Sequence, residues 1–74
     1  MDKIEIIGAY ITLGQLLKLT DFIDSGAQAK VAVKTLKIFV NGEPEDRRGR
    51  KLYPNDLVVI EKKQFMMEAC KSKV

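Results

Sequence analysis

The sequence contains no histidine, and its only cysteine is Cys70. Without histidine the chain lacks the commonest general base and the commonest metal ligand. A lone thiol cannot close an internal disulfide and is typical of a reducing cytoplasm. No nucleophile beside a base and no pair of buried acids is apparent. We therefore expect a cytoplasmic protein that is not an enzyme and that holds no metal or other cofactor.

Long hydrophobic runs are also missing. The longest uncharged stretch, residues 6–17, is shorter than the roughly 20 apolar residues that cross a bilayer. The N-terminus does not resemble a signal peptide, because Asp2 and Lys3 cancel and no small-residue cleavage site follows. The segment around Phe65 is too short and too weakly amphipathic to predict binding to a membrane surface. We expect no membrane contact.

The length of 74 residues allows one domain, and 46% of the residues are hydrophobic, as in an ordinary globular chain. We expect a single domain over residues 1–74, with its core at about residues 10–61 and a C-terminal extension over residues 62–74. A core of this size cannot enclose a deep pocket. The function should therefore lie on the surface of what we expect to be a monomer.

Charge is unevenly distributed along the chain, although the net charge is only +3. Residues 1–29 hold two lysines against four acidic residues, whereas residues 30–51 hold seven basic residues against three acidic ones. The basic residues of the second segment are Lys30, Lys34, Lys37, Arg47, Arg48, Arg50 and Lys51. Such asymmetry indicates an anionic partner better than the total charge does.

The first half of the chain predicts a short strand and two capped helices. Residues 4–6 alternate as a strand does. Thr12 and Gln15 fit a capping box, which begins a helix over about residues 13–20. The same pattern at Ser25 and Gln28 begins a second helix, whose buried side comprises Ala29, Ala32, Val33 and Leu36. Lysines at 30, 34 and 37 would share one face of that helix.

The second half predicts strands and turns. Residues 37–40 are rich in β-formers and are followed by Asn41-Gly42, a strong hairpin signal. Residues 47–52 return in extended or irregular form, residues 53–56 form a second turn, and residues 57–60 form a strand. Beyond them, Phe65, Met66 and Ala69 make one face of a short terminal helix, or the end frays. The predicted fold class is α+β, with two short helices packed on a small, mainly antiparallel sheet.

Three motifs occur in one order: ITLGQLLK at residues 11–18, SGAQAK at residues 25–30, and VNGEPEDRRGRKLYPND at residues 40–56. This pattern resembles the S-four-like RNA-binding domain, or alpha-L motif, named for a ribosomal small-subunit protein. It is most similar to small stand-alone members of the YaaA/YbcJ type, and it covers about residues 10–60. Ala27 and Asn55 stand where glycines are common, and asparagine tolerates the left-handed conformation of a turn.

The resemblance implies a bacterial protein that binds structured RNA, often ribosomal RNA, through its helical hairpin and adjoining basic loops. By position, it implies RNA contacts at Lys18, Lys30, Arg47, Arg48, Arg50 and Lys51. Helical spacing adds Lys34 and Lys37 to this expected surface. Tyr53 borders the basic run and is a candidate for stacking on RNA bases.

Each of these residues also has a purely structural interpretation. The arginines suit phosphate oxygens, but they could equally form a solvated loop with Glu43, Glu45 and Asp46 as internal partners. The lysines could be the polar face of any surface helix. Phe39 points away from its strand neighbours and either stacks on RNA or packs under the terminal segment. Tyr10 is expected to pack in the core or at an edge.

Two other functions compete with RNA binding. The same basic face could bind an acidic protein, as an adaptor does. The stretch IFVNGEPE followed by KLYPNDLVVI also resembles small β-grasp sulfur carriers. Those carriers need a C-terminal Gly-Gly, whereas this chain ends in KSKV, and two successive helices before the hairpin fit that fold poorly.

Overall fold

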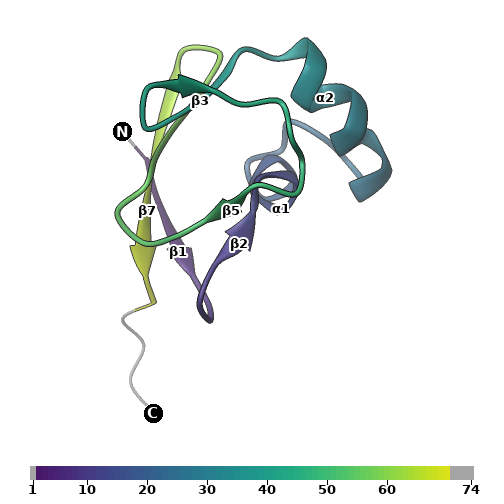
Figure 1. The fold of residues 1–74 in the computed structure, drawn as a ribbon. Coiled ribbons are helices and arrows are strands. Elements are labelled where there is room, and N and C mark those ends of the chain that lie inside the picture. Colours follow the sequence, from purple (N-terminus) through teal and green to yellow (C-terminus); the bar gives the residue numbers. More distant parts are fainter. Residues whose placement is uncertain (1, 71–74) are drawn as a thin grey trace.

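The domain combines two sheets with a pair of short helices, as seen in a computed structural model that describes residues 2–70 (Figure 1). The helical elements are α1 (Leu13–Leu19), a 3-10 turn η1 (Gly26–Gln28) and α2 (Ala29–Thr35). The sheets are mainly antiparallel, so the expected α+β class is confirmed. Within residues 2–70, no helix is long and apolar enough to span a membrane.

The larger sheet has five strands, in the order β1-β7-β6-β3-β4. In that order they span Asp2–Ile6, Lys63–Ala69, Leu57–Ile60, Ile38–Val40 and Glu43–Pro44. Only β1 and β7 pair in parallel; the other neighbours are antiparallel. The smaller sheet pairs β2 (Ile11–Thr12) with β5 (Lys51–Leu52), next to α1 (Figure 1).

The core forms where one face of the large sheet meets the apolar sides of both helices. Strand alternation points Val40, Val58 and Ile60 inward, and each is almost fully buried. Leu16 and Leu17 of α1 are completely buried in the same cluster. Burying one such side chain stabilises a fold by about 1.5 to 3 kcal/mol. The helices are therefore fixed against the sheet, and their positions define the surface around them.

The C-terminal segment differs from the prediction, because residues 63–69 form the strand β7 and not a helix. Phe65 and Met67 are buried while Met66 between them is half-buried, which is the period of a strand. β7 gains partners on both sides, β6 and β1. The buried hydrophobic core therefore includes Phe65 and Met67 of β7 as well as Ile6 of β1.

The helix ends follow the predicted caps with one correction. Gln15 N donates to Thr12 Oγ1 at 3.2 Å, and Thr12 N donates to Gln15 Oε1 at 2.8 Å, so the first capping box is confirmed. The second helix begins with the 3-10 turn and ends at Thr35, and Leu36 is extended. Lys37 therefore lies beyond the helix, and the prediction that it shares a helical face with Lys30 and Lys34 is wrong.

Both predicted turns are present. Asn41 and Gly42 have φ of 52° and 86°, and Val40 pairs with Glu43 across them. Positive φ at both central residues is the backbone of a two-residue hairpin turn, which suits Asn-Gly. Asn55 has φ of 78°, as expected for the left-handed position of the second turn. The two turns are bonded to each other, because Asn41 Nδ2 donates to Asp56 Oδ1 at 3.1 Å.

Candidate nucleic-acid interface

The basic loop, residues 46–51, is docked on the first turn of α1. Leu13 N donates to Arg50 O at 2.8 Å, and Gly14 N donates to Arg48 O at 2.9 Å. These bonds satisfy two of the N–H groups that a helix N-terminus leaves free. A Cβ at Gly14 would lie 3.3 Å from Ala29 Cβ and 3.4 Å from Arg48 O. Glycine therefore allows α1, α2 and the basic loop to meet closely.

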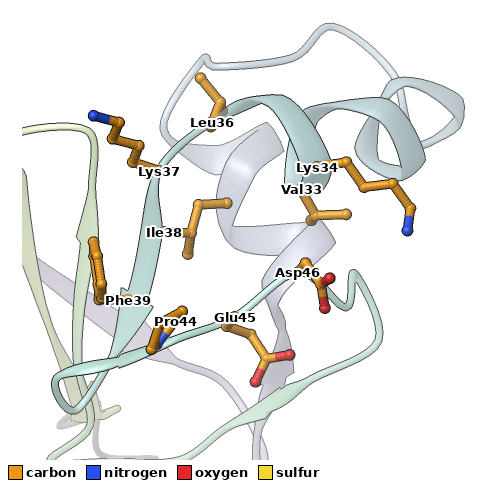
Figure 2. Close-up of a pocket in the computed structure, with 9 residues that line it drawn as sticks. All are labelled: Val33, Lys34, Leu36, Lys37, Ile38, Phe39, Pro44, Glu45 and Asp46. Carbon is orange, nitrogen blue, oxygen red and sulfur yellow. The ribbon is translucent and has the colours of Figure 1, made fainter.

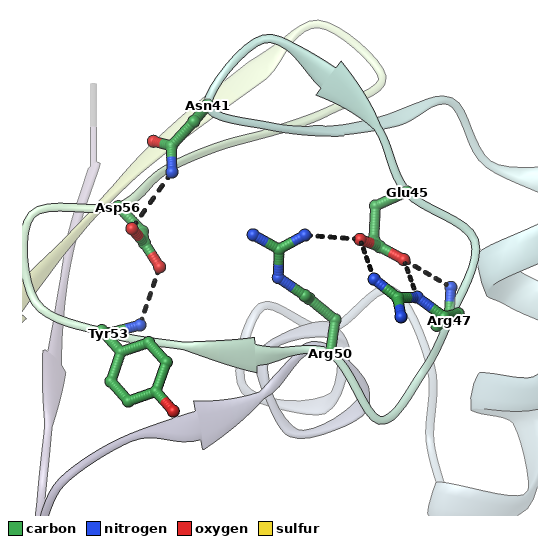
Figure 3. A network of polar contacts seen from close by, with 6 residues as sticks. All are labelled: Asn41, Glu45, Arg47, Arg50, Tyr53 and Asp56. Atoms are coloured by element: carbon green, nitrogen blue, oxygen red, sulfur yellow. Dashed lines mark hydrogen bonds and ion pairs between the residues drawn. The ribbon is translucent and has the colours of Figure 1, made fainter.

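Glu45 organises the basic loop from inside. It is only 8% exposed. Its carboxylate accepts hydrogen bonds from Arg47 Nε at 2.8 Å, Arg47 N at 3.2 Å and Arg50 Nη1 at 2.7 Å (Figure 3). A buried carboxylate is costly unless such donors surround it. Glu45 thus ties Arg47 and Arg50 together across the loop.

The electrostatics of this cluster keep the carboxylate ionised. Hydrogen bonds from the Arg47 side chain are the main cause that lowers the pKa of Glu45 from 4.5 to about 2, and burial opposes them while Arg50 assists. The hydrogen bond to Glu45 in turn raises the pKa of Arg47. The internal-partner interpretation of the basic run is therefore correct for Arg47 and Arg50, although the Arg47 side chain is still 71% exposed.

Arg48 is arranged differently from its two arginine neighbours. Its residue is exposed, and its side chain forms no hydrogen bond or ion pair with any residue of the described 2–70 segment. It lines a shallow hollow together with Lys18, and we call this hollow the basic hollow. The residues around it are Thr12, Gly14, Gln15, Lys18, Gly26, Ala29, Arg48 and Gly49. The docked loop thus brings one arginine and one lysine to the opening between the two helices.

A second surface adjoins the loop on its other side. Arg47, Arg50, Lys51 and Tyr53 line it together with Gly49. Tyr53 is 47% exposed, and its ring lies 5.8 Å from the ring of Tyr10 between centroids. Four of the residues predicted to contact RNA are therefore neighbours in space as well as in sequence.

The predicted lysine face is divided. Lys30 is exposed next to Ala29, which lines the basic hollow. Lys34 and Lys37 line another hollow with Glu45 and Asp46, and Figure 2 shows their side chains extending in opposite directions. Asp46 adds negative charge to that hollow, whereas the Glu45 carboxylate is already bonded to Arg47 and Arg50. Lys30 thus follows a residue of the basic hollow without lining the hollow itself, and Lys37 lines a different hollow.

Two contributors were missed by reasoning from sequence. Glu45 was considered only as one of three possible acidic partners, and nothing in its local sequence marks it as the buried one. Tyr10 was expected to pack in the core or at an edge; it is 40% exposed beside the small sheet, and its contacts with Tyr53 and Lys51 were not foreseen. The sequence gives no signal for these contacts, because they depend on the pairing of Ile11 with Leu52, which are distant in sequence. Phe39 is half-buried and lines the hollow with Lys34 and Lys37.

The site offers positive charge and aromatic surface, but its chemistry is limited. In the part of the chain that the structure describes, no group of three or more His, Cys, Asp or Glu side chains could hold a metal ion. Cys70 is exposed at the end of the described residues. The arrangement can bind an anion with extended shape, through guanidinium and ammonium groups on a fixed backbone.

Comparison with known proteins identifies the fold. The family model described as "S4 domain" matches residues 4–68. The "Probable ribosome maturation protein RlbA" of Bacillus subtilis (strain 168) is 53% identical over 60 residues, which are 81% of this chain and 84% of that protein. The "Small ribosomal subunit protein uS4m" of Schizosaccharomyces pombe is 44% identical over 45 residues, 61% of this chain but only 14% of that protein. The chain belongs to the S4 domain family.

Proposed function

We propose that this domain binds structured RNA without catalysing a reaction, and that the RNA is ribosomal RNA or a ribosome assembly intermediate. The observation that carries the proposal is the docking of the basic loop on α1, which places Arg48 and Lys18 on one hollow. Both relatives named above carry ribosomal names, which supports the ribosome as the source of the RNA. The domain would act as a monomer in the cytoplasm.

The residues divide into direct contacts and supports. Arg48, Lys18, Lys30 and Lys51 supply exposed charge to phosphates. Arg47 and Arg50 are partly neutralised by Glu45, so they fix the loop and offer their remaining donors at its surface. Such contacts position the RNA backbone and carry little sequence information.

Salt dependence tests the mechanism. About five phosphate contacts predict a log-log slope of the binding constant against salt of roughly −3 to −4.5. The measurement is a binding titration with purified, folded ribosomal RNA over a series of salt concentrations. Affinity that does not change with salt would contradict phosphate recognition.

Charge reversal tests the site. Arg48→Glu should weaken binding on the order of tenfold, because a charge-assisted contact is replaced by repulsion. Lys62→Glu changes the net charge equally but lies in the β6–β7 turn, away from the basic hollow. Equal losses in both variants would show that only total charge matters. Competition by an acidic polypeptide as strong as that by RNA would instead support a protein adaptor.

The identity of the RNA needs a measurement in cells. Crosslinking the protein to RNA and sequencing the attached fragments should recover ribosomal RNA or its precursors. Recovery of other structured RNAs would keep RNA binding but reject the ribosomal assignment. Recovery of no RNA above background would reject both.

A further inference from the structure

The small sheet presents two tyrosines on its outer face. Ile11 pairs with Leu52, and both point into the core, with 9% and 0% exposure. Alternation along the two strands therefore turns the neighbouring residues Tyr10 and Tyr53 outward, next to each other. Their rings lie 5.8 Å apart and are inclined by 53°. The pair is 40% and 47% exposed, which leaves a large apolar area open to solvent.

Lys51 makes the two rings unequal. It pairs with Thr12 in the same small sheet. Its Nζ lies 4.9 Å from the centroid of the Tyr10 ring, a cation–π contact. One face of Tyr10 is therefore occupied by the ammonium group, whereas Tyr53 has no such cover among residues 2–70.

The backbone of Tyr53 is fixed by a chain of polar contacts. Tyr53 N donates to Asp56 Oδ2 at 2.8 Å, and Asn41 Nδ2 donates to Asp56 Oδ1 at 3.1 Å (Figure 3). The turn is also bonded to β7, because Asn55 N donates to Met67 O at 2.8 Å. Because the backbone that carries the ring is already fixed, only the side-chain torsions of Tyr53 need to be ordered when a ligand stacks on it.

Cationic residues share one surface with the exposed ring. Tyr53 lines one surface with Arg47, Arg50 and Lys51. An unpaired nucleotide offers a flat base for an aromatic ring and a phosphate for such cations. A fully paired helix offers only the phosphates, since its bases are stacked on one another.

We propose that Tyr53 is a stacking platform for an unpaired RNA base, with Tyr10 and Lys51 as positioning residues beside it. This inference rests on the proposed function and adds a preference for RNA with a bulge or loop over continuous duplex. Tyr10 packs against the side of Tyr53, and Lys51 holds Tyr10 while remaining near the phosphate that follows the base.

The affinity test compares two RNA probes, a hairpin with one bulged adenosine and the same hairpin with the bulge deleted. Tyr53→Leu keeps apolar bulk but removes the aromatic face, and should weaken binding to the bulged probe by about 5- to 100-fold. Binding to the paired probe should change by less than about twofold, because it uses phosphates only. Tyr53→Phe, the matched control, should retain binding to both probes.

Intrinsic fluorescence gives a second readout that a structural role would not move. The chain has two tyrosines and no tryptophan, so in the Tyr10→Phe variant Tyr53 is the only tyrosine and dominates the emission. Its emission should be quenched by the bulged probe and much less by the paired probe at saturation.

The outcomes separate the two proposals. Salt-dependent binding to both probes, with equal losses for Tyr53→Leu and no selective quenching, would overturn the stacking platform and leave RNA binding intact. If the protein bound neither probe and also did not bind ribosomal RNA, both the stacking platform and the proposed RNA-binding function would be overturned. Thermal unfolding of Tyr53→Leu shows whether a loss on both probes comes from misfolding; in that case the fluorescence of Tyr10→Phe decides.

Discussion

The basic loop and the lysines of α2 both carry positive charge, but they are built in different ways. The loop is fixed by the buried Glu45 carboxylate and by two backbone hydrogen bonds to α1. Lys30 and Lys34 project from a helix face, and neither forms an ion pair within residues 2–70. A fixed charge selects the geometry of its partner, whereas a mobile one mainly adds long-range attraction. We therefore expect the loop to determine the orientation of the bound RNA, and the lysines to determine mainly its association rate.

The largest expected effect comes from removing the support of the loop. Glu45→Gln should lower the free energy of unfolding by about 1 to 3 kcal/mol, because charged hydrogen bonds from Arg47 and Arg50 are lost. Denaturant unfolding of the variant measures this. Glu43→Gln, an exposed glutamate of the same hairpin, should change little. An equally large loss in Glu43→Gln would mean that hairpin charge in general, and not this cluster, holds the loop.

The ionised Glu45 carboxylate also makes the stability of the domain depend on pH, in a direction that its pKa fixes. The pKa of Glu45 in the folded state, about 2, lies below its ordinary value of 4.5. Its contribution is therefore complete above about pH 4.5 and is lost as the pH falls from there toward 2. The stability difference between wild type and Glu45→Gln should shrink over this window.

A smaller effect is expected where the loop touches the helix. Alanine at Gly14 gains about 1 kcal/mol of helix propensity, but overpacking against Ala29 and the Arg48 carbonyl typically costs 1 to 3 kcal/mol. Because both neighbours belong to anchored backbone segments, we expect a net loss of stability of up to about 2 kcal/mol and weaker RNA binding. Gly26→Ala is the matched control, since its added Cβ would meet nothing within 4 Å. If both substitutions stabilised the domain, the basic loop would have to shift away from a Cβ at residue 14 at little energetic cost.

The lysines should have the smallest effects. Lys30→Ala should reduce RNA affinity by a few fold and lower the salt slope by about 0.7 to 0.9, the value for one phosphate contact. Lys37→Ala should change neither, because Lys37 lies beyond α2 in the hollow that also holds Glu45 and Asp46. Neither change should alter unfolding. If Lys37→Ala had the larger effect on the slope, the RNA would follow the other side of α2.

Local signals predicted most of the fold. The first capping box, the Asn41-Gly42 turn and the Asn55 turn depend on residues close in sequence, and each is present. The prediction of a helix or a frayed end over residues 63–69 was wrong, because a short apolar run fits the period of a strand as well as that of a helix. Only the neighbours β1 and β6, which are distant in sequence, decide between them.

The candidate site shows the same division. Arg48 and Lys18 could be named from motif and charge, and the fold places them on one hollow. The burial of Glu45 and the exposure of Tyr10 could not, because both depend on tertiary packing. The prediction that Lys37 shares a helical face was wrong because α2 ends at Thr35, two residues before Lys37.

The parallel pairing of β1 with β7 has a consequence for how the domain folds. Asp2 aligns with Phe65 and Ile6 with Ala69, so the first strand of the chain pairs with the last strand described. Contacts between residues so far apart close the longest loop in the chain and slow the search for the native state. During synthesis, β1 leaves the ribosome first, and it remains unpaired until β7 has emerged. We therefore expect the helical hairpin and β3–β4 to form early and β1 to be the last strand added to the sheet.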